Sequence, residues 1–209
     1  MILIRYSKLN GAEFIPHLDT LKHLTKILRR AQIKVNYSKG FSPHILMFMS
    51  SPIALGLKSE SEYLLIDTFE SANGFKEKFN KYSPKGIKCE EVFETDKKVG
   101  VASDIVYADY EISGLEIFDI NEVLDSSEFF ITDKKGVEKE VRDKIISLKF
   151  DKNKLIARLK FGNDTLRPDY LAVKLQELYG GEHIDIYKKS VGFKGNTDVK
   201  TYLENLQCR

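Results

Sequence analysis

The chain has 209 residues, of which 42% are hydrophobic and 31% are charged, and its formal net charge is +2. This composition is typical of a globular protein with one large domain or two domains of about 100 residues each. The near-neutral total charge does not indicate any partner, and no apolar run reaches the roughly 20 residues of a membrane span.

The chain begins MILIRYSKLN, which contains neither the apolar region nor the cleavage site of a signal peptide. We therefore expect a soluble, cytoplasmic protein without a membrane partner. The two cysteines, Cys89 and Cys208, are far apart, which argues against a disulfide framework and against the closely spaced thiolates of an iron–sulfur site. No glycine-rich motif of a nucleotide-phosphate loop occurs. We expect no cofactor in this chain.

Residues 1–96 predict a first domain. Residues 1–6 have the pattern of a strand, and a helix is expected next because Leu18, Leu21, Leu24, Leu28 and Ala31 recur at helical spacing. The further elements expected here are strands at residues 33–37, 44–50, 62–68 and 87–93 and a helix at 72–82. Because the 44–50 segment is apolar on both faces, it predicts a central strand covered from both sides. We interpret the order as the βαββαβ, or ferredoxin-like, arrangement, with one strand more than that plan contains.

Residues 103–190 predict a second domain of the same plan, after a linker at residues 97–100. The elements expected in it are strands at residues 105–112, 128–132, 144–150, 155–161 and 183–188 and helices at 119–124 and 168–178. A C-terminal tail at 191–209 contains a further predicted helix at 197–206. The fold class expected is therefore α+β, with two ferredoxin-like domains in tandem, antiparallel sheets and helices packed on one face.

The distribution of charge is more informative than its total. Between Thr20 and Ser59 the chain contains no aspartate or glutamate. The same stretch contains the basic residues Lys22, Lys26, Arg29, Arg30, Lys34, Lys39 and Lys58, together with His23 and His44. On the predicted helix, the cations at positions 22, 26, 29 and 30 lie opposite the leucines. Such a segment favours an anionic partner, most simply nucleic-acid phosphate, although a solvated helix face is an alternative explanation.

The sequence YSKGFSPH at residues 37–44 concentrates polar groups in one loop. Gly40 can adopt a positive φ and expose backbone N–H groups, and the neighbouring serines and lysine add hydroxyls and a charge. Phe41 can stack on a base, which contributes on the order of 1–3 kcal/mol per base, or it can belong to the core. Tyr37 lies on the apolar face of a predicted strand, so we expect it in the core. The loop is predicted to bind an anion.

Arg167 stands immediately before the predicted helix at 168–178, where the helix dipole disfavours a cation. We expect a specific partner for it, either a carboxylate of the chain or a bound anion. The complete predicted set of substrate- or anion-binding residues is Lys22, Lys26, Arg29, Arg30, Ser38, Lys39, Gly40, Phe41, Ser42 and Arg167.

Two histidines, His17 and His44, are candidates for general acid–base catalysis, because the pKa of imidazole lies near 6.5. With Asp19 and Glu62 they could also form a metal site, although their spacing matches no local metal-binding motif, and Glu60 is a further polar neighbour. The alternative is structural: histidines often cap turns, and an aspartate at a helix start often caps the helix.

Several motifs together resemble a known family. They are HLD at residues 17–19, RRA at 29–31, YSKGFSPH at 37–44, LGLKSESEY at 55–63 and LRP at 166–168. This set is similar to that of the radical SAM-linked protein family, a domain of unknown function (DUF2344). Two positions depart from the family pattern: Pro16 replaces the usual serine before HLD, and Ile45 replaces a proline.

The resemblance implies a partner and leaves the reaction open. Members of that family are encoded beside, or fused to, radical SAM proteins with a cobalamin-binding-like region, often near genes for ribosomal proteins and an RNase. An iron–sulfur cluster and SAM are then expected only in the partner. The leading hypothesis is a non-catalytic RNA- or ribosome-related recognition protein that acts with a radical SAM enzyme. The alternatives are a metal-dependent or histidine-based RNA-processing hydrolase and a purely structural docking subunit of the radical SAM protein.

Overall fold

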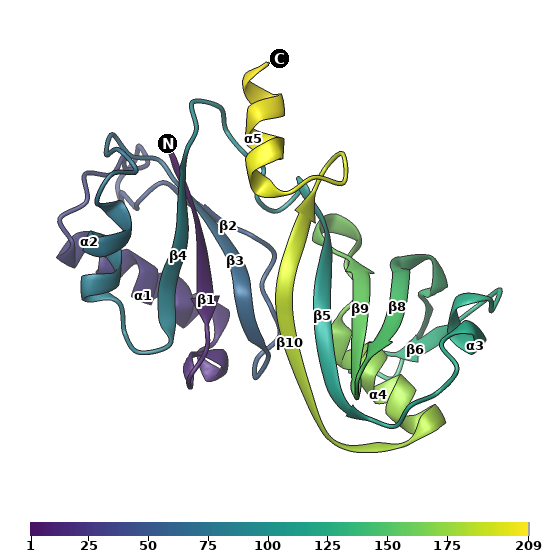
Figure 1. The fold of residues 1–209 in the computed structure, drawn as a ribbon. Coiled ribbons are helices and arrows are strands. Elements are labelled where there is room, and N and C mark those ends of the chain that lie inside the picture. The colour runs from purple at the N-terminus through teal and green to yellow at the C-terminus, as the bar shows by residue number, and fades with distance from the viewer. Residues whose placement is uncertain (209) are drawn as a thin grey trace.

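The structure is a computed structural model that describes residues 1–208, and Figure 1 shows its fold. Strands and helices of the first half follow one another as β1 (Ile2–Lys8), α1 (His17–Arg30), β2 (Met47–Met49), β3 (Lys58–Ile66), α2 (Phe75–Tyr82) and β4 (Ile87–Glu94). β1 pairs with β4 on one side and β3 on the other, and β2 pairs with β3. All three pairings are antiparallel.

The second half adds four strands to the same sheet. Its elements are β5 (Ile105–Leu115), α3 (Asn121–Leu124), β6 (Phe130–Thr132), β7 (Glu138–Glu140), β8 (Ile145–Asp151), β9 (Lys154–Lys160), α4 (Pro168–Tyr179), β10 (Gly181–Phe193) and α5 (Val199–Gln207). The strand order is β10-β5-β9-β8, again antiparallel. β6 and β7 form a separate two-stranded sheet, so the segment predicted as a strand at 128–132 does not belong to the main sheet.

The two halves share one eight-stranded sheet. β10 lies between β5 and β3, as Figure 1 shows, and its pairing with β3 is the parallel one. We call this junction the seam; its partners are Tyr187 with Lys58 and Lys188 with Ser59. The α+β class with a mostly antiparallel sheet is confirmed. The sheet is continuous across the predicted boundary at residues 97–102, and β10 extends to Phe193, inside the predicted tail.

The first half of the sheet is covered on both faces. Because side chains alternate along a strand, Ile2 and Ile4 of β1 pack with α1 and α2, whereas Leu3 packs into a second cluster. That second cluster contains the core of the second half, the segment around Val101, and Leu203 of α5. Burial on both faces explains the short apolar runs at residues 2–4 of β1 and 63–66 of β3.

Two predicted strands between α1 and β3 differ from the structure. Residues 33–37 form isolated bridges only, Val35 with Thr68 and Tyr37 with Ile45. The predicted central strand at 44–50 is the short β2, which pairs only with β3 among the described strands and leaves Phe48 38% exposed. Apolar residues on both faces did not indicate a central position here, because the residues of β2 line an open groove described below.

No helix within residues 1–208 has the length and apolar character that crossing a lipid bilayer requires. α2 begins at Phe75, three residues later than predicted, since Gly74 adopts a positive φ of 71° just before it.

The two cysteines are expected to differ strongly in reactivity. Cys89 in β4 is fully buried, and burial raises the pKa of its thiol to about 12, whereas Cys208 is exposed. Because only the thiolate reacts, Cys89 in a Cys208→Ser variant should react with a disulfide reagent at pH 8 at least about 10³-fold more slowly than Cys208 in a Cys89→Ser variant. The measurement is absorbance of the released thiolate in native protein. Equal rates for the two variants would contradict the burial of β4.

Candidate functional site

α1 presents a basic face to solvent. Leu24, Ile27 and Leu28 are buried, and the cations predicted on the opposite side, at positions 22, 26, 29 and 30, are exposed. Leu18 was expected in the buried stripe but is 68% exposed. At 100° per residue it lies about 120° around the helix from Leu24, outside the stripe.

Most of these cations have no partner among residues 1–208. Lys22 forms an ion pair with Asp19 at 2.9 Å, on the exposed first turn of α1. By contrast, none of the salt bridges found among residues 1–208 involves Lys26, Arg29, Arg30 or Lys39. We call Lys26, Arg29, Arg30 and Lys39 the free cations. Their charges are available to an anion outside the chain.

The loop at residues 37–44 is closed by its own hydrogen bonds. Ser38 Oγ lies 2.8 Å from His44 Nδ1 and accepts from the His44 amide N–H at 3.1 Å, while the Ser38 amide donates to the His44 carbonyl at 2.8 Å. Gly40 has a φ of 133° at the turn. His44 therefore holds the loop in shape, as expected of a structural histidine, and Ser38 is engaged in the same closure.

The tip of this loop exposes aromatic rings. Phe41 is completely exposed, and Lys39, Gly40 and Ser42 around it are exposed as well. Tyr37, which was expected in the core, is 46% exposed because residues 33–37 do not form a strand in the sheet. An exposed phenylalanine in the same loop as the unpaired Lys39 can stack on a base while the lysine contacts phosphate.

The four candidate acid–base and metal residues do not share one site. His17 and Glu62 line a small cavity together, but neither cavity lined by His17 includes Asp19 or His44. Within residues 1–208 no group of three or more histidine, cysteine, aspartate or glutamate side chains is arranged to hold a metal ion. Asp19 is paired with Lys22, and hydrogen bonding to that lysine lowers the pKa of its carboxyl.

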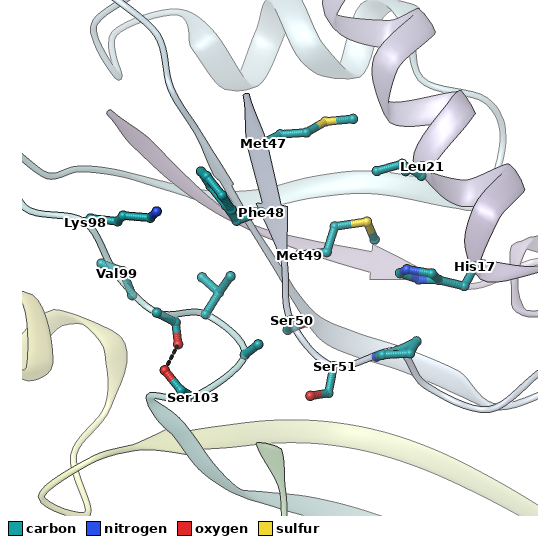
Figure 2. Close-up of a pocket in the computed structure, with 14 residues that line it drawn as sticks. His17, Leu21, Met47, Phe48, Met49, Ser50, Ser51, Lys98, Val99 and Ser103 are labelled. Carbon is teal, nitrogen blue, oxygen red and sulfur yellow. Dashed lines mark hydrogen bonds between the residues drawn. The ribbon is translucent and has the colours of Figure 1, made fainter. Parts of the chain in front are cut away.

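A groove of about 520 Å³ lies between the start of α1, β2 and the segment 98–103. Figure 2 shows His17 and Leu21 on one side, Met47, Phe48 and Met49 from β2 in the centre, and Lys98 across from them. The Lys98 Nζ lies 4.3 Å from the centre of the Phe48 ring. No acidic residue lines the groove, so it combines apolar walls with positive charge.

A polar cluster is buried at the seam beside the groove. Lys188 and Glu62 form an ion pair at 2.9 Å, with side chains that are 0% and 4% exposed, and Ser59 Oγ donates to the same carboxylate oxygen at 2.7 Å. Nearby, Lys8 donates to the Ile15 carbonyl at 2.6 Å, and burial lowers the pKa of its ammonium. Glu62 is thus an internal counterion and not an exposed ligand.

Glu60 lies at the more exposed part of the seam, where it pairs with Lys189 at 3.0 Å and accepts a hydrogen bond from the Tyr187 hydroxyl. Sequence reasoning missed the roles of Lys8, Lys98 and Lys188. For Lys8 and Lys188 the only available signal was a lysine inside a strand, which does not reveal the partner, and Lys98 in the expected linker gave no signal.

Arg167 has the carboxylate partner that was one of the two expectations. Its Nε donates to Asp169 Oδ1 at 3.0 Å, a second guanidinium nitrogen contacts Asp169 Oδ2, and the guanidinium lies 4.4 Å from the centre of the Tyr170 ring. The hydrogen bond to Asp169 raises the pKa of Arg167. The residue is half-buried at the start of α4 and lines a further cavity.

Comparison with known proteins identifies a family. A model of the family described as "Uncharacterized protein conserved in bacteria (DUF2344)" matches residues 1–168, which is most of the chain. A search of curated proteins gives no significant match. The matched region contains the free cations, the loop at residues 37–44, the groove and Arg167. Because the match spans well over half of its length, the chain belongs to the DUF2344 family of uncharacterized bacterial proteins.

Proposed function

We propose that this chain is a non-catalytic RNA- or ribosome-related recognition protein that acts with a separate radical SAM enzyme. The observation that carries this proposal is the set of free cations on α1 and the adjacent loop, which are exposed and unpaired and lie in an acid-free stretch of sequence. Phosphate neutralises such cations best, and release of its counterions favours binding. In this proposal the iron–sulfur cluster and SAM reside in the partner.

We also infer that each half follows the ferredoxin-like plan. The strand orders β4-β1-β3-β2 and β10-β5-β9-β8 correspond position by position, if β6 and β7 are taken as an insertion before β8. Sheets of this plan often bind single-stranded RNA on an open face. Here the first-half sheet is covered on both sides, so the proposed RNA contacts lie on α1 and the loop instead.

The groove favours a second candidate, a docking role on the radical SAM protein. β2 has an open edge beside apolar side chains, and an extended segment of a partner could pair with such an edge. The third candidate, a hydrolase that uses His17 and His44 as a pair, is favoured by no contact in the structure. His44 is engaged with Ser38, and His17 lies at the groove.

Replacing Arg29 and Arg30 together by alanine is expected to weaken binding of a short single-stranded RNA at low salt. Each phosphate contact on a single strand contributes about 0.7 to the slope of log K against log salt, so the slope should fall in magnitude by about 1.4. Both side chains are exposed, and the fold should be unaffected. The measurement is fluorescence anisotropy of labelled RNA across a salt series.

A charge-matched control is Lys134→Ala with Lys135→Ala, which removes two exposed lysines from the turn between β6 and β7. This control should retain the wild-type slope. If wild-type protein fails to bind RNA at low salt, or if both double variants lose the same slope, the proposed RNA surface is wrong. Association with the radical SAM protein that persists at high salt without RNA would instead favour the docking role.

A further inference from the structure

A separate cavity of about 180 Å³ lies where the segment 52–54 passes over the start of α4. It is lined by Pro52, Ile53, Ala54, Tyr110, Phe161, Thr165, Arg167 and Pro168. The two halves of the chain therefore both contribute to it, the first through the 52–54 segment and the second through β5 and α4. Neither the free cations nor the loop at residues 37–44 line this cavity.

The hydroxyl of Tyr110 lacks a partner in this cavity. Tyr110 is 2% exposed, and its hydroxyl forms no hydrogen bond with another residue in the described part of the chain. Burial raises the pKa of the phenol, with smaller contributions from the carboxylates of Glu62 and Asp169. The hydroxyl is therefore a neutral donor at any physiological pH. The residue is buried, but its hydroxyl oxygen is not fully enclosed, so a ligand or water in the cavity can accept its hydrogen bond.

The start of α4 has further donors, in the residues that directly follow Pro168. α4 has 12 residues and begins with Pro168, which lines the cavity, and no side chain caps it. In its first turn the amides of Asp169 and Tyr170 donate to no acceptor among residues 1–208, whereas the Leu171 amide donates to the Arg167 carbonyl. The amides at a helix N-terminus and the helix dipole favour an anion.

Arg167 adds N–H donors, of which its partner Asp169 uses only some, although the carboxylate balances its charge. Two of its guanidinium nitrogens are directed at Asp169, and a guanidinium has five N–H donors in total. The other charged groups near Tyr110 are already paired: Glu62 is neutralised by Lys188, and that lysine lies 4.3 Å from the Phe161 ring, which also lines the cavity. The unsatisfied groups around the cavity are thus donors.

We propose that this cavity binds the phosphate group of a small molecule. Tyr110 Oη, the guanidinium of Arg167 and the first-turn amides of α4 would donate to its oxygens, as in other phosphate sites built on a helix start. The volume of the cavity is that of roughly six water molecules at about 30 Å³ each. This volume suits the five heavy atoms of a phosphate group but not a stretch of polynucleotide. The proposal does not depend on RNA binding at α1.

Inorganic phosphate is the probe, and isothermal titration at constant ionic strength, with chloride replaced by phosphate, is the measurement. Wild-type protein should bind phosphate saturably at one site. Tyr110→Phe removes only the unpaired hydroxyl and should fold normally, yet it should bind phosphate about ten- to a hundredfold more weakly, as expected for the loss of a hydrogen bond to an anion. Arg167→Lys keeps the charge but loses the planar fork, and should also weaken binding.

The matched control is Tyr107→Phe, which removes a hydroxyl from the same strand at a residue that packs on Arg158 and does not line the cavity. It should bind phosphate as the wild type does. The proposal is overturned if wild-type protein shows no saturable phosphate binding, if Tyr110→Phe binds as tightly as Tyr107→Phe, or if acetate binds in the same titration and phosphate does not. Removal of the α1 cations by Arg29→Ala with Arg30→Ala should leave phosphate binding unchanged.

Discussion

Lys188→Ala is expected to lower the free energy of unfolding by about 3–5 kcal/mol. The substitution leaves the Glu62 carboxylate buried at the seam without its counterion, and an unpaired buried charge has a desolvation penalty of that order. The effect should be large because the β3–β10 pairing spans only two residue pairs, so this ion pair is a principal polar contact between the halves. Urea denaturation followed by circular dichroism measures it.

Two further variants separate charge from packing. Lys189→Ala removes the neighbouring lysine, which forms an ion pair with Glu60. Both side chains of that pair are about one-third exposed, so the substitution should lower the free energy of unfolding by less than about 1 kcal/mol. Glu62→Leu combined with Lys188→Met removes both buried charges and should recover most of the stability lost in Lys188→Ala, since no charge then lacks a partner. If Lys188→Ala costs no more than Lys189→Ala, the seam does not depend on the buried pair.

Phe41→Ala is expected to lower affinity for single-stranded RNA by about 5- to 150-fold, which corresponds to the 1–3 kcal/mol that one stacked base contributes. Because the ring is completely exposed, its removal should leave the melting temperature unchanged. Stacking involves no counterion release, so the salt slope should also stay as in the wild type. This combination differs from the one expected for the α1 arginines, where the slope itself changes.

Fluorescence anisotropy with the same labelled RNA measures this effect, with Phe130→Ala as the control. Phe130 is 42% exposed in β6, which belongs to the separate two-stranded sheet. The control should bind RNA like the wild type, whatever its stability. Unchanged affinity of Phe41→Ala would show that the loop tip does not stack on a base, and the proposed RNA surface would then be confined to the cations of α1.

The pattern of residues predicted much of the local structure because local structure depends on near neighbours. The helical spacing of Leu24 and Leu28 located the buried side of α1, and the same spacing placed Arg29 and Arg30 on the exposed side. Gly40 was recognised as a turn residue and has a positive φ. The α+β class and the family followed from the order of such elements and from short motifs.

Errors arose where an apolar run had two explanations. Residues 44–50 read as a central strand, but β2 is a short edge strand whose residues line a groove. Tyr37 read as a core residue because alternation predicted a strand, whereas the segment is held by isolated bridges and side-chain bonds such as that of Asn36 with Asp67. Periodicity shows which face of an element is apolar, but it does not show which other elements pack against that face.

The sequence by itself determined the basic face of α1, the acid-free stretch between Thr20 and Ser59, the polar loop at residues 37–44 and the kind of elements that carry them. Only the tertiary structure decided that Glu62 is the buried counterion of Lys188, 126 residues away, and that Arg167 and Tyr110 meet under the 52–54 segment. Whether a charged or hydroxyl group is buried, paired or available depends on strands that pair across the seam. That pairing is set by long-range packing of two halves, which no local pattern encodes.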